Sequence, residues 1–167
     1  MPIPQSLMRF LPTLRRGPAA QANITGDPDH PRLRGTVRFY PAERGVLVLA
    51  EVFGLPDKGR RCENGIFGFH IHSGGACCGS ADEPFADALG HYNPDRCPHP
   101  AHAGDMPPLF SNGGYAVQAF LTDRFTVREI LGRTVVIHDD VDDFISQPAG
   151  NAGERIACGV IRKAGRR

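Results

Sequence analysis

Apolar and polar residues alternate over several stretches of the chain, with the period of two that is typical of half-buried strands. In residues 33–40, for example, Leu33, Val37 and Phe39 alternate with polar and charged side chains. Clusters of Gly, Pro and Asp separate such stretches about every ten residues, as in antiparallel sandwiches and barrels. The pattern predicts an all-β protein with strands at residues 20–24, 33–40, 46–53, 66–72, 115–121, 125–129, 133–138 and 156–161.

Two segments lack this alternation. Residues 1–17 show no sustained period and are expected to form an irregular lead-in to a single domain over residues 18–167. Residues 73–112 have no convincing period either, but they are rich in Gly, Pro, Cys, His and Asp. Structureless segments of this length are uncommon in compact domains and are usually functional or disordered. The aromatic, aliphatic and metal-binding types of residue in this segment favour a functional loop over disorder.

The chain of 167 residues is long enough for one buried core. Its formal charge of +1 favours neither a nucleic-acid partner nor an anionic membrane. Short basic clusters near both ends are interpreted as solvated termini; they comprise Arg15, Arg16, Arg162, Lys163, Arg166 and Arg167.

No apolar run approaches the length of a membrane span, and proline and arginine interrupt the first residues where a secretory leader would need an apolar stretch. The sequence therefore predicts a cytoplasmic protein. Its five cysteines would then normally be thiols or metal ligands.

Histidine is distributed very unevenly, since six of the seven histidines lie between residues 70 and 138. His70 and His72 are two positions apart on a predicted strand, so their side chains project from the same face and can share one metal ion. His138 ends another predicted strand and can supply a third imidazole. Such a cluster indicates metal binding.

The long loop carries a second set of candidate ligands, namely His91, His99, His102 and Asp105. Three imidazoles and one carboxylate suit a closed zinc site, although Cys97 is a competing ligand. Two sites with four ligands each need eight, and six histidines with Asp105 give seven. A histidine shared by both metals would complete the two sets, and His91 lies between them in the sequence; the number of ligands permits this bridge without requiring it.

Five motifs together resemble the copper/zinc superoxide dismutases, in the family's order and spacing. They are GFHIH at 68–72, HYNP at 91–94, HAGD at 102–105, GRTVVIH at 132–138 and GNAGERIACGVI at 150–161. The resemblance is strong from Ile66 to Ile161, is limited to compatible strands over residues 19–53, and does not include residues 1–17.

The resemblance implies an eight-stranded Greek-key barrel or sandwich whose loops hold copper and zinc, with superoxide as the substrate. A homodimer is compatible with the sequence, which does not establish the oligomeric state. It assigns copper to His70, His72, His91 and His138, and zinc to His91, His99, His102 and Asp105, with His91 as the bridge. Asp142 matches the acid that binds the outer nitrogens of His70 and His99. Arg155 matches the residue that attracts and orients the anion, and His91 also delivers a proton.

The resemblance further implies a disulfide bond from Cys158 to the loop after His72, where both Cys77 and Cys78 are available. Cys77 fits the short bacterial-type loop better, and Cys62 and Cys97 are most simply free thiols. Two features depart from many relatives: Ser73 replaces a frequently acidic residue, and residues 144–149 contain no charged side chain. The second departure removes the charged helpers that guide superoxide in animal relatives.

Two other functions fit part of the sequence. A non-catalytic copper-binding or copper-delivery module could use the same fold. A zinc hydrolase could use the His70-x-His72 pair, but it would need a nearby general base, and no glutamate is suitably placed beside this pair.

Overall fold

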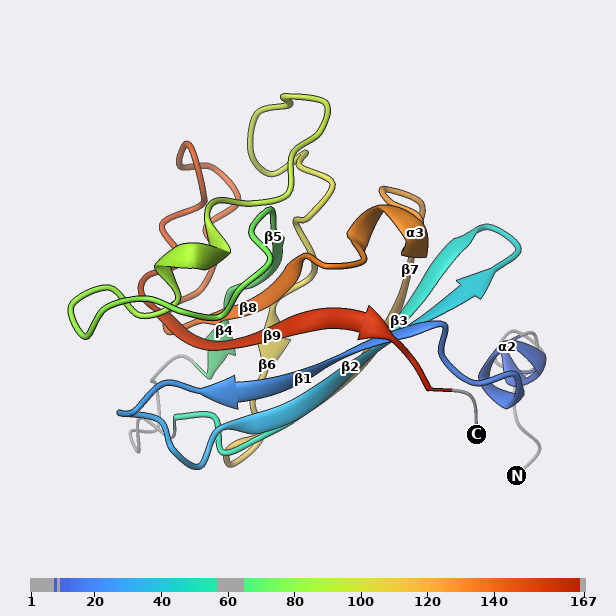
Figure 1. The fold of residues 1–167 in the computed structure, drawn as a ribbon, viewed down its shortest axis with the longest axis horizontal. Coiled ribbons are helices and arrows are strands. Elements are labelled where there is room, and N and C mark those ends of the chain that lie inside the picture. Colours follow the sequence, from blue (N-terminus) through green and yellow to red (C-terminus); the bar gives the residue numbers. More distant parts are fainter. Residues whose placement is uncertain (1–7, 9, 57–64, 166–167) are drawn as a thin grey trace.

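A curled antiparallel sheet is the main regular structure in this computed structural model, which describes Met8 and residues 10–56 and 65–165 (Figure 1). The elements are α2 (Leu11–Arg15), β1 (Ala20–Gly26), β2 (Arg34–Ala42), β3 (Gly45–Phe53), β4 (Ile66–Phe67), β5 (Phe69–His72), the 3-10 turn η1 (Ala86–Ala88), β6 (Leu109–Phe110), β7 (Tyr115–Thr122), α3 (Val127–Ile130), β8 (Thr134–His138) and β9 (Arg155–Lys163).

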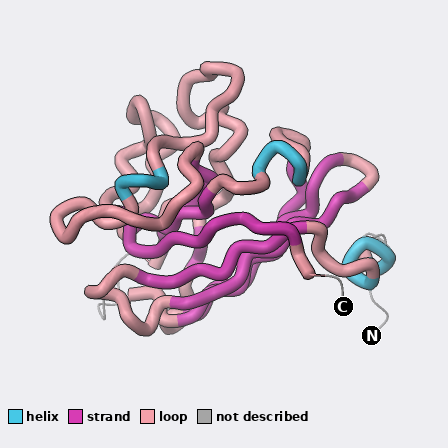
Figure 2. The backbone as a smooth tube through the Cα atoms, in the orientation of Figure 1, coloured by secondary structure: helices cyan, strands magenta, loops and turns pink. Residues whose placement is uncertain are grey.

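The strand order confirms the predicted all-β, Greek-key class. Seven strands form one sheet in the order β5-β8-β9-β1-β2-β3-β7, and β4 pairs separately with β6. The first three strands are joined as hairpins, whereas β7 adds beside β3 and β9 returns to lie beside β1. The long loops gather at one end of the strands, where they surround β5 (Figure 2).

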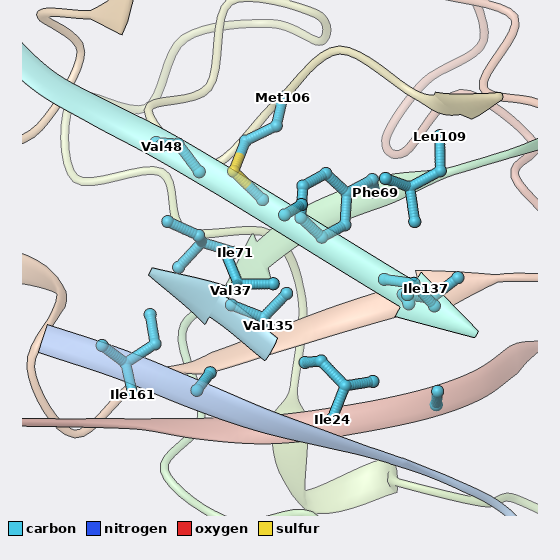
Figure 3. Packing of buried hydrophobic residues seen from close by; sticks show 14 of the residues in the cluster. Ile24, Val37, Val48, Phe69, Ile71, Met106, Leu109, Val135, Ile137 and Ile161 are labelled. Atoms are coloured by element: carbon cyan, nitrogen blue, oxygen red, sulfur yellow. The ribbon is translucent and has the colours of Figure 1, made fainter. Parts of the chain in front are cut away.

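The core explains why the alternating positions form strands. Ala20, Ala22 and Ile24 of β1 are fully or nearly fully buried, while the residues between them are more exposed. Side chains from the strands meet in the interior, and Met106 and Leu109 from the end of the long loop join them (Figure 3). The loop is therefore ordered partly by burying its own apolar residues.

Three local predictions differ from the structure. Residues 125–129, predicted as a strand, contain helix α3 instead, because Thr126 and Glu129 form a capping box at its start. The predicted strand at 66–72 is divided into β4 and β5 at Gly68, whose backbone bonds to Asp140 and His138 rather than to a continuous ladder. The described part of the chain therefore contains nine strands, because β6 also forms inside the long loop.

The N-terminal lead-in was expected to be irregular, but its described part contains α2. This helix has no buried residue, and it contacts β2 rather than the core. The domain boundary at residue 18 stays a prediction.

A disulfide bond joins Cys77 in the long loop to Cys158 in β9, with the two Cα atoms 5.6 Å apart. This confirms Cys77 as the partner. Cys78 and Cys97 are free cysteines, and Cys62 lies outside the described residues. Cys77 packs with Phe85 against the buried Ala88, Val136 and Cys158, so the bond attaches the loop to the sheet at this point.

Replacing Cys158 with Ser should lower the free energy of unfolding by about 2–4 kcal/mol, because the bond closes a long loop and restricts the unfolded chain. The two cysteines are 81 positions apart. Urea unfolding of the metal-loaded protein measures the effect, and Cys78→Ser is the matched control. Equal unfolding free energies for the two variants would contradict a stabilising role of the bond.

Candidate metal centre

Strands β5 and β8 bring three histidines together. The two strands pair so that His70 lies opposite Val136 and His72 opposite Thr134. Both histidines of β5 are buried, while Ile71 between them belongs to the hydrophobic core. His138 is the last residue of β8 and is also buried. The alternation of the strand thus turns the histidines toward the long loops and the isoleucine toward the core.

The outer nitrogen of each of these rings has a fixed partner. His70 donates from Nε2 to the Asp142 carboxylate at 2.7 Å. His72 donates from Nδ1 to the Leu89 carbonyl at 2.7 Å, and His138 donates from Nδ1 to the Gly153 carbonyl at 3.2 Å. These bonds select the tautomer and leave the other nitrogen of each ring as a lone-pair donor.

The remaining nitrogens converge with one nitrogen of His91. The ligand-type atoms of His70, His72, His91 and His138 all lie within 4.8 Å of one another. Nε2 of His72 and Nε2 of His138 are 3.2 Å apart. We call these four residues the first donor group.

The long loop supplies a second donor group, which consists of His91, His99, His102 and Asp105. Its ligand-type atoms also lie within 4.8 Å of one another. Asp105 Oδ1 is 2.8 Å from His91 Nδ1 and 3.3 Å from His102 Nδ1, and Asp105 Oδ2 is 3.1 Å from His99 Nδ1. His91 therefore belongs to both groups, as the resemblance had implied.

Three imidazole nitrogens in these groups are buried and make no hydrogen bond: His70 Nδ1, His91 Nε2 and His99 Nδ1, the last of which lies 3.1 Å from Asp105 Oδ2 without a hydrogen bond to it. A buried polar atom without a partner costs about 1–3 kcal/mol, so three of them in one place require an explanation. All three belong to rings of the donor groups, and two of those rings are bound at their other nitrogen by Asp142. Metal ions would satisfy the free lone pairs, and the residues therefore fit two bound metals.

Burial favours the neutral, metal-binding form of the three strand histidines, His70, His72 and His138. It lowers the pKa of His70, although the hydrogen bond to Asp142 opposes this shift. Burial lowers the pKa of His72 well below its usual value, and the nearby His138 and His91 act in the same direction. Burial, assisted by His70, lowers the pKa of His138 to about 3.

The two carboxylates are ionised in the same environment. Burial by itself would raise the pKa of Asp142, but hydrogen bonds from His70, from the Phe144 amide and from His99 outweigh it and hold the pKa well below the usual range. Burial likewise opposes the ionisation of Asp105, and the hydrogen bond from His91 with the neighbouring imidazoles lowers its pKa on balance. Both carboxylates therefore supply negative charge to balance cations in the site.

Asp142 connects the two donor groups from outside. It accepts from His70 Nε2 at 2.7 Å and from His99 Nε2 at 2.9 Å. Gly150 covers this carboxylate with φ of +71°, and a Cβ atom there would collide with Asp142 Oδ1 and lie 2.7 Å from His99 Nε2. Only glycine combines this backbone conformation with this close approach.

Arg155 is fixed beside the first donor group by the long loop. It donates from Nη1 to the Phe85 carbonyl at 2.8 Å and from Nη2 to the Leu89 carbonyl at 3.0 Å. The Leu89 carbonyl also receives His72, so one peptide oxygen positions both residues. Phe85 and Leu89 have φ of +58° and +61°, a conformation that non-glycine residues rarely adopt. Such strain is concentrated at functional sites.

Two further residues hold the second donor group and were not identified from the sequence. The Gln147 side chain pairs with the backbone of His99, donating to its carbonyl at 2.7 Å and accepting from its amide at 3.0 Å. Arg124 donates to the carbonyls of Pro100, His102 and Asp105 at 3.0–3.3 Å. Because both bind backbone atoms across the fold, their own sequence neighbourhood carries no signal of this role.

The remaining candidates lie outside the two groups. Cys97 is a free cysteine whose backbone amide and carbonyl bond to Asn93, and it is in neither donor group. His30, the histidine outside the cluster, is bonded to Asp27 instead. The competing zinc ligand suggested by the sequence is therefore not brought to the site.

Residues 33–161 match the sequence profile of copper/zinc superoxide dismutases. The chain is 38% identical over 143 residues to "Superoxide dismutase [Cu-Zn] 2" of Aquifex aeolicus, which covers 77% of this chain and 78% of that protein. It is 34% identical over 149 residues to "Superoxide dismutase [Cu-Zn]" of Deinococcus radiodurans, with 78% of each covered.

A solved structure shows the same fold. The copper/zinc superoxide dismutase from Brucella abortus superposes with a TM-score of 0.71 at 26% identity, covering 84% of this chain and 98% of that one. The likeness therefore extends over most of the chain.

The metal-free chain should lose unfolding free energy as the pH falls below about 6.5. An unfolded histidine takes up a proton near this pH, whereas His138 in the folded chain does so only at a pKa of about 3. Between these values protons stabilise the unfolded state by about 1.4 kcal/mol per pH unit for each such histidine. Urea unfolding at pH 7.5, 6.5 and 5.0 should show that the unfolding free energy of the unchanged protein falls steeply with pH. In His138→Asn this fall should be smaller by about 2 kcal/mol. A stability that does not depend on pH over this range would show that the rings are not buried as neutral groups.

Proposed function

The chain belongs to the copper/zinc superoxide dismutase family, and from this premise we propose which of its residues carry out the conversion of superoxide to oxygen and hydrogen peroxide. The observation that carries the proposal is the pair of buried donor groups that share His91. Superoxide is the substrate, and copper and zinc are the cofactors.

Copper is assigned to the first donor group, His70, His72, His91 and His138, and zinc to the second, His91, His99, His102 and Asp105. The chemistry of the ligands supports this division, because a set of four imidazoles suits copper, while three imidazoles and a carboxylate suit zinc. When bound, copper supplies alternating one-electron reduction and oxidation of superoxide, and zinc supplies a redox-inert positive charge. The orphan nitrogens of His70, His91 and His99 support the assignment, because each would gain its missing partner.

His91 is proposed to move a proton as well as to bridge the metals. Two superoxide ions and two protons yield one oxygen molecule and one hydrogen peroxide, so the site must deliver protons. His91 Nε2 lies in the first donor group and has no hydrogen-bond partner, while Nδ1 is held 2.8 Å from Asp105. The ring can therefore hold a proton at Nε2 while Nδ1 keeps its position in the second group.

Arg155 is proposed to bind and orient superoxide. Two of its five N–H donors are used by the Phe85 and Leu89 carbonyls, which fix the direction of the guanidinium. Its positive charge contributes to lowering the pKa of His138, which supports its position next to the first donor group. A fixed cation there attracts a small anion and aligns it without reorganisation.

Guidance of superoxide rests on few charges in this chain. Between Asp143 and Gly150 the loop contains no charged residue. Arg155 is consequently expected to provide a larger share of the electrostatic attraction than it would in a relative with a charged loop.

The two alternative functions are not favoured. The family of the chain and its complete pair of donor groups fit a dismutase better than a copper-delivery module. A zinc hydrolase would need an open coordination position with a general base beside it, whereas both groups here offer four ligands. The homodimer and the cytoplasmic location stay predictions from the sequence; among the described helices, none is long and apolar enough to cross a membrane.

Replacing His138 with Ala should remove copper but leave zinc bound, because His138 belongs to one donor group only. His91→Ala should disturb both metals, and His30→Ala, outside both groups, should retain both. Elemental analysis of the purified variants gives the copper and zinc content per chain. The shared role of His91 is wrong if His138→Ala and His91→Ala lose the two metals in the same proportions.

Replacing Arg155 with Ala should keep both metals and lower the dismutation rate about tenfold, because it removes the cation that attracts and aligns superoxide. Attraction of this kind weakens with added salt, so the rate of the unchanged protein should fall with ionic strength more steeply than that of the variant. The exposed Arg128→Ala removes the same charge elsewhere and is the matched control. A fully metallated Arg155→Ala protein that is as fast as Arg128→Ala would contradict the assignment.

A further inference from the structure

The outward face of the sheet is hollowed beside helix α2. This helix lies at the other end of the molecule from the loops that hold the donor groups (Figure 1). The cavity has a volume of about 1160 Å³. Arg15 and Arg16 line it from the end of α2, and Arg38 lines it from β2. None of the residues of the two donor groups contributes to it.

The register of the sheet explains why polar groups gather in this cavity. Gln21 of β1 lies opposite Arg38 of β2, and Asn23 lies opposite Thr36. Their strand neighbours Ala22 and Val37 are fully buried in the core, so these four side chains must point outward. They therefore form a polar floor from two neighbouring strands.

Helix α2 forms the wall of the cavity. It contacts β2, and Tyr40, which also lines the cavity, is only 6% exposed at this place. The helix carries Arg15 in its last turn, and Arg16 follows as its C-cap. Arg15 and Arg16 are exposed to solvent, as the sequence suggested, and they line the same cavity as the partly buried Arg38 of the sheet.

Among the residues that the structure describes, none balances the charge in this cavity. No described Asp or Glu lines it, and no described carboxylate forms an ion pair with Arg15, Arg16 or Arg38. The acidic residue opposite Thr36 on the neighbouring strand, Glu51, accepts a hydrogen bond from the Tyr115 hydroxyl at 3.2 Å. Three guanidiniums in one cavity, in a chain whose net charge is only +1, are a local excess of positive charge.

We propose that this cavity binds a molecule that carries clustered phosphate groups, in a site separate from the dismutation site. Guanidinium groups bind phosphate oxygens through two parallel hydrogen bonds, and three of them can neutralise several phosphate charges. The amides of Gln21 and Asn23 and the hydroxyl of Thr36 add neutral donors and acceptors on the floor. The volume matches or exceeds that of typical small-molecule sites, so a nucleotide or a short polyphosphate chain can enter.

Calorimetric titration of the copper- and zinc-loaded protein tests the proposal with three probes. Inorganic tripolyphosphate presents the phosphates alone, adenosine triphosphate adds an organic part, and adenosine lacks phosphate. Both phosphate compounds should bind, and adenosine should not. Since phosphates also bind metals, elemental analysis after each titration must show unchanged copper and zinc content. If adenosine triphosphate binds more tightly than tripolyphosphate, its adenosine part also contacts the protein. If the two bind equally, the phosphates alone account for the affinity. Both outcomes support the proposal.

Two variants that each remove one positive charge distinguish binding in this cavity from binding to arginines elsewhere on the surface. Arg38→Gln should weaken binding of tripolyphosphate about tenfold, as expected for loss of a charge-assisted hydrogen bond. Arg128→Gln on α3, outside the cavity, should change it less than about twofold, as a distant surface charge does. The combined replacement of Arg15, Arg16 and Arg38 by Gln should abolish binding, while the dismutation rate stays that of the unchanged protein.

Arg155 is the competing anion site. The combined replacement and Arg155→Ala distinguish it from the cavity. Binding that survives the combined replacement but is lost in Arg155→Ala would place the phosphate in the dismutation site and overturn the proposal. If Arg38→Gln and Arg128→Gln weaken phosphate binding equally, the binding is general attraction by surface charge and the proposed site is wrong. Absence of binding by both phosphate compounds would also overturn it.

Discussion

The arrangement of the metal centre depends on one buried carboxylate, that of Asp142, which accepts hydrogen bonds from His70 and His99. These two rings come from different donor groups, so the carboxylate fixes the orientation of both groups relative to each other. By holding the outer nitrogens, it leaves His70 Nδ1 and His99 Nδ1 as buried lone pairs without partners. The protein alone does not satisfy these atoms, and bound metal ions are the simplest way in which a folded chain could stabilise them.

The loops that complete the site are held mostly by backbone atoms. The Leu89 carbonyl receives both His72 and Arg155, so displacement of this single peptide would disturb a proposed copper ligand and the proposed anion-binding residue together. The disulfide bond from Cys77 to Cys158 attaches the same loop to β9. At the second donor group, Gln147 pairs with the His99 backbone and thereby links the loop after β8 to this group. Loops without regular secondary structure are in this way positioned well enough for metal binding.

Sequence patterns predicted the features that depend on local periodicity. The strands with alternating residues are present, and the same alternation places His70 and His72 on one face. The pattern failed where a local hydrogen bond competes with it: residues 125–129 also alternate, but the capping box of Thr126 and Glu129 begins a helix there. The sequence pattern could not reveal the roles of Arg124 and Gln147, because their partners are backbone carbonyls and amides that only the fold brings near. The cavity around Arg38 was hidden for the same reason, since α2 reaches β2 only in three dimensions.

The most direct test of the account is anomalous X-ray diffraction from crystals of the metal-loaded protein, recorded on both sides of the copper and zinc absorption edges. This measurement identifies the element at each position without any substitution. The account predicts a copper signal within the first donor group and a zinc signal within the second, with His91 adjacent to both. A single metal position, or copper located among His99, His102 and Asp105, would contradict it.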